Sequence, residues 1–461
     1  MWIALTGLVA GILSAGISLV FVAAVGSAGV IACFPRRGPW RALGLVTVCF
    51  ALGAGNALLR SPEQQPAAAL AESVPSCEVV GRTLEEAGGL GLLAAADALE
   101  CNGRRIFEGG VVFLDDVRMG AGRRFEARGW LLPLGDGSFD SARRRAGAAA
   151  AFHATSAGDA GPASPAHALA HRTREGLEDA TEALGAPGAL LRGLTIGDTS
   201  GLDTTTTEAL RRSGLAHLLA VSGSNVAILL GAIALTLRRA AFVVRLGACA
   251  TGLAAFVLVV GPDASVLRAA AMGVVALSAL AGGRSTHPLH ALGLGLAGVV
   301  ALRPGIVHST GLHLSAVATL GIVLWTRPLR RRMRRVPDVL ALPLAATMAA
   351  QAAVAPLLVA VFGQLPIAGL PANLLALPAV APATVLGLAA AAAGTVHAGA
   401  AGALARLAGP FAWWVLAVGE RFGEPPWASL PISPRWGIFL ALPLVVLAAG
   451  AVRGALSAPG A

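Results

Sequence analysis

Long apolar stretches separated by short polar turns occupy both ends of this chain. Residues 2–34 and 42–59 are almost free of charge. A second series starts near residue 213 and contains nine apolar segments, at 216–237, 242–260, 264–282, 289–303, 308–326, 338–362, 366–394, 397–419 and 436–453. Because a helix needs about 20 apolar residues to cross a bilayer, the pattern predicts a mainly α polytopic membrane protein with about 11–12 transmembrane helices.

The stretch between the two apolar series has a different character. It contains charges, prolines and short runs typical of β-strands at 110–115 and 124–132. We therefore expect three parts: N-terminal transmembrane helices over 1–59, a soluble β-rich insert with its linker over 60–190, and a second transmembrane domain over 191–461. The first apolar stretch lacks a basic start, so we expect a retained anchor rather than a signal peptide.

Composition narrows the class of protein. The chain is 56% hydrophobic and 13% charged, which excludes an ordinary soluble protein. All 35 basic residues are arginine, and a P-loop ATPase needs a lysine. The five cysteines form no CxxC pair, and the nine histidines show no HExxH or HxHxD spacing. We expect no metal, no cofactor and no enzymatic activity.

Basic loops predict the orientation of the chain in the membrane. The strongest, RPLRRRMRR at 327–335, should lie in the cytoplasm, and five predicted spans separate it from the insert. This count makes the insert extracytoplasmic. Cys77 and Cys101 both lie in the insert, where oxidising conditions permit a disulfide, although two buried free thiols would also fit the sequence.

Polar side chains interrupt the apolar segment at 210–237. It carries His217, Ser222, Ser224 and Asn225 where a membrane helix would be apolar. An unpaired polar group in hydrocarbon costs several kcal/mol, so such a cluster faces a hydrated path or another helix. The cluster is therefore a candidate site.

Four local patterns, in order, resemble the ComEC family of bacterial competence proteins. The strongest is LTIGDTSGLDTTTTEALRRSGLAHLLAVSGSNVAIL at 194–229, in which Ser224 and Asn225 replace the family's Leu-His pair. The others are DASVLRAAAMGVVAL at 263–277, GLHLSAVATLGIVL at 311–324, and AAQAAVAPLLVAVFGQLPIAGLPANLLALPAV at 349–380. The looser match GWLLPLGDGSFDSARRRAGAAAAFHA follows the position of the family's OB-like domain.

The resemblance implies an inner-membrane channel for single-stranded transforming DNA, with a small extracytoplasmic OB-like domain. The pathway residues would be His217, Ser222, Ser224, Asn225, Arg268, His313, Gln351 and Asn373. The OB-like domain would contact DNA through an arginine groove and aromatic platforms, for which the candidates are Arg104, Arg105, Phe107, Arg123, Arg124 and Trp130. Prolines that break the later helices would supply a hydrated route, namely Pro343, Pro356, Pro366, Pro371 and Pro378. Equally, these prolines could only kink helices that pack together.

The resemblance also implies partners. Besides single-stranded DNA and membrane lipid, we expect an external DNA receptor, a cytoplasmic helicase-like ATPase and single-strand-binding proteins. The chain stops after its last apolar segment, without the metallo-β-lactamase-like domain of many family members, so a separate nuclease is expected. A homo-oligomer is left open.

Simpler interpretations stay open beside each of these expectations. The polar residues could join helices, the histidines could be packing residues, and Arg268 could pair with Asp263 or extend to the interface. The arginines of the insert could form a solvated surface. A secondary transporter of a small solute is the alternative function, because broken helices and midplane polar groups serve it too. An intramembrane enzyme using Ser222 or His217 lacks an acid or base at suitable spacing.

Overall fold

The computed structural model describes residues 66–86, 92–433 and 436, apart from short gaps within these ranges. The gaps are 116, 118, 120–121, 136, 138–139, 141–142, 144–147, 220, 222, 262, 284–287, 303–305 and 307–308. The predicted spans at 2–34 and 42–59, and nearly all of the one at 436–453, lie outside the described residues.

The soluble insert folds as a five-stranded closed barrel after a short helix, α4 (Pro66–Ala71). Its strands are β1 (Ser76–Glu86), β2 (Leu92–Cys101), β3 (Arg104–Asp115), β4 (Arg123–Leu132) and β5 (Ala150–Pro162). They close in the order β1-β2-β3-β5-β4, with β3 and β5 parallel and every other pair antiparallel. A five-stranded barrel of this kind confirms the expected OB-like domain.

The barrel has its own core because its strands alternate between inward and outward side chains. In β4, Phe125, Ala127, Gly129 and Leu131 are buried while Glu126, Arg128 and Trp130 between them face outward. Phe125, Ala127 and Leu131 meet Leu114 and Phe152 from β3 and β5 in one apolar cluster. The insert therefore has an apolar core of its own.

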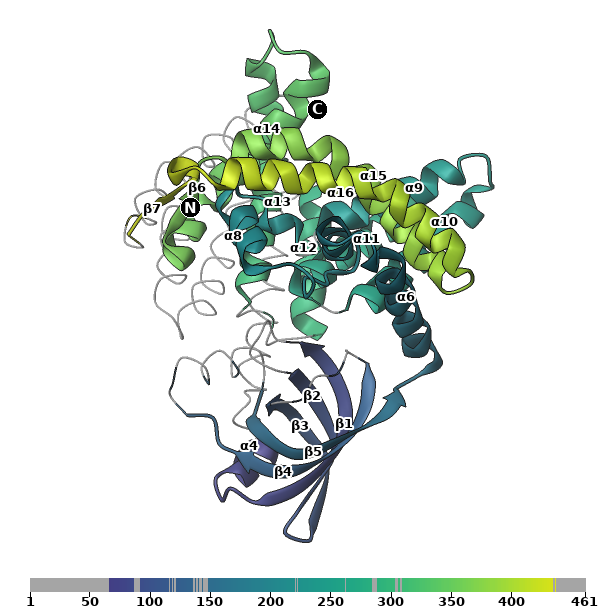
Figure 1. Ribbon diagram of the computed structural model, residues 1–461, viewed down its shortest axis with the longest axis vertical. Coiled ribbons are helices and arrows are strands. Elements are labelled where there is room, and N and C mark those ends of the chain that lie inside the picture. Colours follow the sequence, from purple (N-terminus) through teal and green to yellow (C-terminus); the bar gives the residue numbers. More distant parts are fainter. Residues whose placement is uncertain are drawn as a thin grey trace, which may run out of the picture.

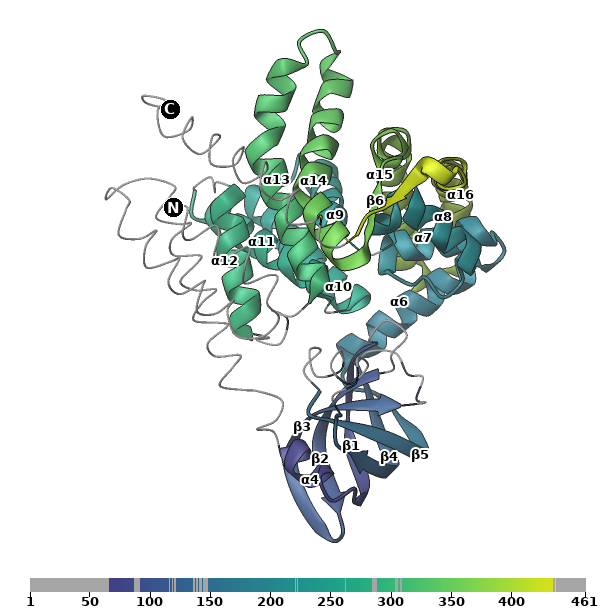
Figure 2. The same cartoon turned by 90° about the vertical axis from the view of Figure 1, so that its left-hand side faces the viewer.

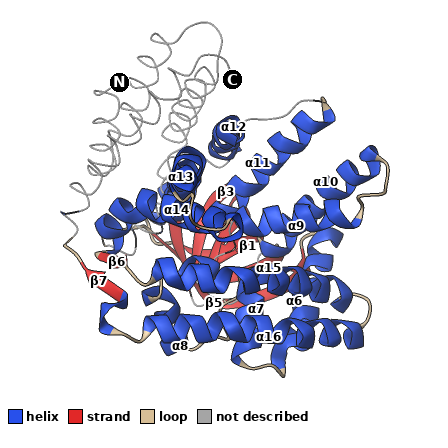
Figure 3. Cartoon of the chain, turned by 90° about the horizontal axis from the view of Figure 1, so that it is seen from above, coloured by secondary structure: helices blue, strands red, loops and turns tan. Residues whose placement is uncertain are grey.

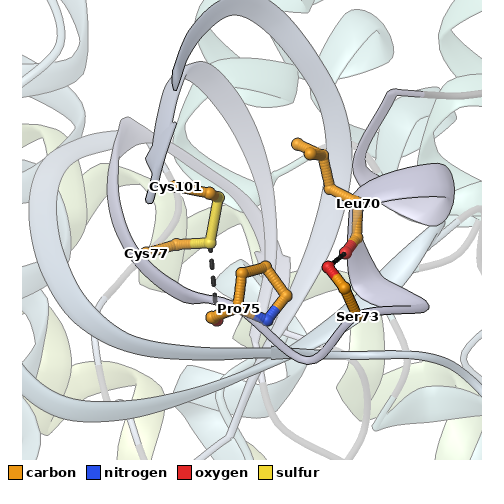
Figure 4. Close-up of a disulfide and its surroundings, with 5 residues drawn as sticks. All are labelled: Leu70, Ser73, Pro75, Cys77 and Cys101. Atoms are coloured by element: carbon orange, nitrogen blue, oxygen red, sulfur yellow. Dashed lines mark hydrogen bonds between the residues drawn. A yellow bond between two sulfur atoms is a disulfide. The ribbon is translucent and has the colours of Figure 1, made fainter. Parts of the chain in front are cut away.

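Cys77 and Cys101 form a disulfide inside this barrel (Figure 4). The two residues are direct partners in the β1–β2 ladder, and their Cα atoms are 4.2 Å apart. The Cys77 sulfur also lies 3.6 Å from the Pro75 carbonyl oxygen, and just before it the Ser73 hydroxyl donates a hydrogen bond to the Leu70 carbonyl oxygen at 3.1 Å. The bridge fastens the first two strands of the barrel together near the chain's entry into it.

The rest of the described chain is helical (Figure 1). The helices are α6 (Pro165–Glu182), α7 (Ala186–Ile196), α8 (Thr204–Arg212), α9 (Gly223–Thr236), α10 (Phe242–Val260), α11 (Ala264–Ala281), α12 (Pro288–Leu302), α13 (Thr310–Arg332), α14 (Asp338–Phe362), α15 (Gly369–Gly394) and α16 (Ala398–Gly423). A 3-10 helix, η2 (Ala216–Leu218), precedes α9, and two short strands, β6 (Gln364–Pro366) and β7 (Ser429–Pro431), pair near the end.

Six described helices are long and apolar enough to cross a membrane: α10, α11, α13, α14, α15 and α16. The shorter α9 and α12 are also apolar. This confirms a mainly helical, multi-pass membrane protein with a small β-barrel. The segment expected to be one span at 216–237 is instead η2 followed by α9, whose helix begins only at Gly223.

Small residues hold the helices close together. The contact faces of α15 and α16 are largely alanine, and a stripe of such residues lets two helices approach closely in a membrane. At the crossing of α6 and α15, a β-carbon on Gly176 or on Gly394 would lie 2.9 Å from the other glycine's backbone. From above, α6 and α7 lie beside α15 and α16, while α9, α10 and α11 form a neighbouring group (Figure 3).

The expected proline breaks are wrong for the two later helices. Pro343 and Pro356 lie inside α14, and Pro378 lies inside α15, yet both helices run on through them. A proline removes one backbone hydrogen bond, and packing against neighbouring helices compensates for this loss in membrane proteins. Pro371 falls in the first turn of α15 and Pro366 in the short strand β6, so these prolines do not open a route by breaking helices.

Candidate functional site

Three of the predicted pathway residues lie around a close contact between Gly214 and Gly369. Gly214 adopts a left-handed conformation with φ 74°, and a β-carbon there would lie 2.9 Å from the Gly369 Cα atom. The His217 Nδ1 atom lies 3.1 Å from the Gly214 carbonyl oxygen. The Asn373 side-chain amide donates to the Gly369 carbonyl oxygen at 2.7 Å, and the Gln351 amide nitrogen occupies the space that a Gly369 side chain would need. His217, Gln351 and Asn373 therefore surround one close contact between backbones.

A second group of polar contacts holds the start of α9. The buried Asn225 side-chain amide donates to the Leu194 carbonyl oxygen of α7 at 2.8 Å. The Ser265 hydroxyl of α11 donates to the Val221 carbonyl oxygen at 2.6 Å. The first turn of α9 is therefore fixed between α7 and α11. The segment 214–225 joins this group to the glycine contact.

Arg268 is the charged residue of this second group. It lies on α11, and only 4% of its surface is exposed. Its Nη1 donates to the Thr319 hydroxyl of α13 at 3.0 Å and to the Met272 sulfur at 3.2 Å, and its Nε, also buried, has no hydrogen-bond partner among the described residues. A β-carbon on Gly223 would lie 2.8 Å from Nη2, so the guanidinium rests against the first residue of α9.

No described carboxylate forms an ion pair with Arg268. Asp263, its suggested partner, is exposed. Arg268 does not extend to the interface either, because it is almost completely buried. The structure thus places an arginine among neutral described groups on α11, a helix long and apolar enough to cross a membrane.

The other predicted pathway residues are less closely grouped. Ser222 lies outside the described residues. Ser224 is exposed and donates to the Asn225 side-chain oxygen at 3.4 Å. His313 is half-buried on α13, and since it precedes Thr319 by six residues it faces about 120° away from it around the helix. The structure therefore joins His217 to Gln351 and Asn373, and Asn225 to the neighbourhood of Arg268.

A charged cluster that the sequence analysis missed lies beside α7. Arg192 donates from Nε to Asp198 at 3.1 Å and from Nη1 to the Thr181 hydroxyl at 3.1 Å. Burial raises the pKa of Asp198, but hydrogen bonds from Ser200 and the charge of Arg192 outweigh this, so the pKa lies below its ordinary value. The aspartate therefore stays ionised at neutral pH and holds the loop after α7.

On the barrel, Phe107 is the most prominent aromatic side chain. It is 70% exposed, and the Arg105 guanidinium lies over its ring, 5.4 Å from the centroid. Trp130 is 46% exposed. Phe107 belongs to β3, whereas Trp130 belongs to β4, and β1 and β2 separate these strands on one side of the barrel and β5 on the other. The two rings are therefore not neighbours on one platform.

The barrel arginines do not form an uninterrupted basic groove. Arg123 pairs with Asp159, and hydrogen bonding to Arg123 is the main cause that lowers the pKa of this aspartate. Arg128 likewise pairs with Glu78 at 3.2 Å. Arg124 is exposed, and the side chain of Arg104 lies outside the described residues. Between residues 76 and 162 there are 12 carboxylates and ten arginines, so the segment is slightly acidic rather than basic.

Two surface hollows of the described chain lie away from the polar groups. One hollow lies between α8 and the end of α16 and is lined by Thr204, Thr205, Glu208, Ala209, Arg212, Gly423 and Glu424. Another lies at the loop between α13 and α14 and is lined by Arg330, Arg331, Met333, Arg334, Val336 and Asp338. Neither includes a predicted pathway residue. Within the described residues, no three His, Cys, Asp or Glu side chains come close enough together to hold a metal ion.

Comparison with known proteins identifies the helical part. A family model described as competence protein matches residues 194–455, more than half of the chain. This range contains both groups of polar contacts around α9. No curated protein and no solved structure matches the chain. The chain belongs to the competence protein family, as its four sequence patterns had indicated.

Proposed function

We propose that this protein is the inner-membrane channel through which single-stranded DNA enters the cell during natural competence. The match to the competence family over 194–455 carries the proposal. A polyanion crossing a bilayer needs polar groups at membrane depth, and the helical domain has them in Asn225, Arg268 and Asn373. We propose the expected pathway residues, Ser222 and His313 included, as its lining.

The proposed orientation has the barrel outside and the arginine-rich loop in the cytoplasm. In Figure 2 the barrel and the turn between α13 and α14 lie at opposite ends of the molecule. The end of α13 and this turn together carry the basic stretch 327–335, and short arginine-rich segments beside membrane helices stay in the cytoplasm. The Cys77–Cys101 disulfide fits an oxidising compartment for the barrel.

Conduction requires the buried polar groups to become accessible. Asn225, Arg268 and Asn373 are at most 6% exposed, so this structure corresponds to a closed channel in the proposal. The contacts from Asn225 to Leu194 and from Arg268 to Thr319 would separate when the channel opens. Such an opening moves α9 or α11 relative to α7 and α13.

We propose the barrel as a weak, sequence-independent contact for the incoming strand. Phe107 with Arg105 offers one place where a base can stack beside a cation, and an outward face of β2 and β3 is where OB-folds bind single strands. An external DNA receptor would deliver the strand. A cytoplasmic helicase-like ATPase and a separate nuclease would supply the energy and the strand degradation, and the residues described here are given no enzymatic role.

The proposal is tested by DNA entry. A deletion strain of the natural host should lose transformation, and the full chain should restore it. Labelled single-stranded DNA is added outside liposomes that contain the purified protein, so that its concentration is higher outside than inside. It should enter these liposomes, whereas liposomes without the protein should exclude it. Normal transformation in the deletion strain would refute the channel function. Uptake of small solutes without DNA would point to a secondary transporter instead.

A further inference from the structure

The side chain of Arg268 lies against the positive end of a helix. The first turn of an α-helix has four backbone N–H groups without partners inside the helix, and the helix dipole places about half a positive charge there. The Arg268 guanidinium rests against Gly223, the first residue of the 14-residue helix α9. Two positive groups therefore meet in a buried place.

In the part of the chain that the structure describes, no side chain neutralises this positive charge. The guanidinium donates hydrogen bonds to the Thr319 hydroxyl and the Met272 sulfur, both uncharged, and its buried Nε has no described partner. Val266, Ala269 and Ala270, which lie beside Arg268 on α11, belong to an apolar cluster with residues of α9 and α10. Burying a charge without a counter-charge is costly, so this arrangement calls for an anion.

The N-terminus of α9 and the Arg268 side chain also lie at similar depths if the helices cross a membrane as proposed. α9 has 14 residues and is about 21 Å long, so if its C-terminal end lies at the cytoplasmic surface its N-terminus lies about 9 Å below the outer one. Arg268 is the fifth residue of α11, which starts at the opposite, outer surface, and this places it about 7 Å below that surface. Both groups lie at a similar depth, inside the hydrocarbon layer.

We propose that the N-terminus of α9 and the Arg268 guanidinium form a binding site for one phosphate oxyanion. Helix N-termini bind phosphate through their backbone N–H groups, and the arginine fork adds two charge-assisted hydrogen bonds. In the proposed channel the ligand is a phosphodiester of the passing strand, and this identification rests on the proposed function. The binding of an oxyanion does not rest on it.

Gly223 and Thr319 position the arginine. A β-carbon at residue 223 would meet Nη2 at 2.8 Å and push the guanidinium away from the helix end. The Thr319 hydroxyl, which itself donates to the Ser315 carbonyl oxygen at 2.8 Å, accepts from Nη1 on the side of α13. The guanidinium therefore has a fixed direction in the resting protein.

The test measures anion binding by the full-length protein in nanodiscs of zwitterionic phosphatidylcholine. The probes are inorganic phosphate, followed by melting temperature, and a labelled oligothymidylate, followed by fluorescence anisotropy. We expect phosphate to raise the melting temperature more than chloride at equal ionic strength. In Arg268→Gln we expect this rise to disappear and oligonucleotide affinity to fall at least tenfold, about 1.4 kcal/mol. The control is Arg331→Gln, which changes an exposed arginine in the last turn of α13, and its affinity should stay within twofold of wild type.

Two further variants keep the test decisive if Arg268→Gln does not fold. Arg268→Lys retains the charge but loses the fork, and Gly223→Ala retains the arginine but displaces it. Both should bind phosphate more weakly than wild type. A phosphate response equal to wild type in every folded variant would overturn the site.

Nanodiscs with phosphatidylglycerol distinguish a lipid headgroup from a strand. Suppose that Arg268→Gln lowers the melting temperature only in these discs, and that in phosphatidylcholine it changes neither phosphate binding nor oligonucleotide binding. The site then binds a lipid headgroup rather than a strand, and the proposal fails. Transformation that persists without this chain, together with phosphate binding that depends on Arg268, would reject the channel and leave the anion site standing. If deletion abolishes transformation but phosphate binding is unaffected by Arg268→Gln, the anion site is rejected and the channel proposal stands.

Discussion

Reduction of the Cys77–Cys101 bridge should destabilise the barrel by a calculable amount. The two cysteines are 24 residues apart in sequence, and closing a loop of this length removes about 3.5 kcal/mol of chain entropy from the unfolded state at 25 °C. Domains of this size are stable by about 5–15 kcal/mol, so the bridge contributes a large fraction. With a typical urea dependence, the midpoint should fall by about 2 M.

The measurement uses the segment 66–163, which contains the closed barrel and its apolar core. Trp130 is the only tryptophan of this segment, so its fluorescence reports the unfolding of the barrel. Urea titrations with and without a phosphine reductant give the two midpoints. A Cys77→Ala/Cys101→Ala double variant is the control, because reductant should not change its midpoint. A shift below about 0.5 M in the wild-type segment would refute the entropic argument.

Three further changes test other parts of the structure. Phe107→Ala should weaken oligothymidylate binding to the barrel by about 1–3 kcal/mol in filter binding, and unchanged binding would remove the ring as a stacking platform. Because the pKa of Asp159 is lowered in the folded barrel, its ion pair with Arg123 stabilises the barrel above about pH 4 and this contribution is lost as the pH falls further. The free energy of unfolding from urea titrations should therefore differ less between pH 7 and pH 3 in Asp159→Asn than in wild type, by at most about 1 kcal/mol. An equal difference in both proteins would argue against the pair. In Gly394→Val the new side chain should collide with the Gly176 backbone and destabilise the full chain by about 1–3 kcal/mol in a melting assay. Gly247 has open space around it, so Gly247→Ala should leave the stability unchanged. Equal melting temperatures of the two variants would contradict the close crossing.

The long helices could be predicted from the sequence because length and apolarity alone define them. The segment expected at 242–260 is α10, residue for residue. The strands of the barrel are harder to predict from the sequence than the helices. β4 shows a clear alternation of buried and exposed positions, but β2 is LLAAADALEC and β5 is AAFHATSAGDAGP, and their alanines, glycine and proline carry little strand preference. Their place in the barrel comes from pairing with β1, β3 and β4.

The candidate site was only partly visible in the sequence. Polar residues within apolar segments identified Asn225 and Arg268, because such residues are rare in membrane helices. Their partners are a backbone carbonyl of α7, a helix end and the Thr319 hydroxyl, and these meet only in the folded chain. Thr319 did lie within one of the family-like patterns, at 311–324, which is the signal that could have singled it out.

The crossing of Gly176 and Gly394 determines how freely the barrel can move. α6 begins three residues after β5 ends, and Arg174 of α6 donates to the Val259 carbonyl oxygen of α10 at 2.5 Å. The linker is thus a stiff arm clamped at two places to the transmembrane bundle. A barrel attached through this arm has little freedom to swing relative to the helices. Under the proposed function, the DNA strand would therefore have to be brought to the barrel by another molecule.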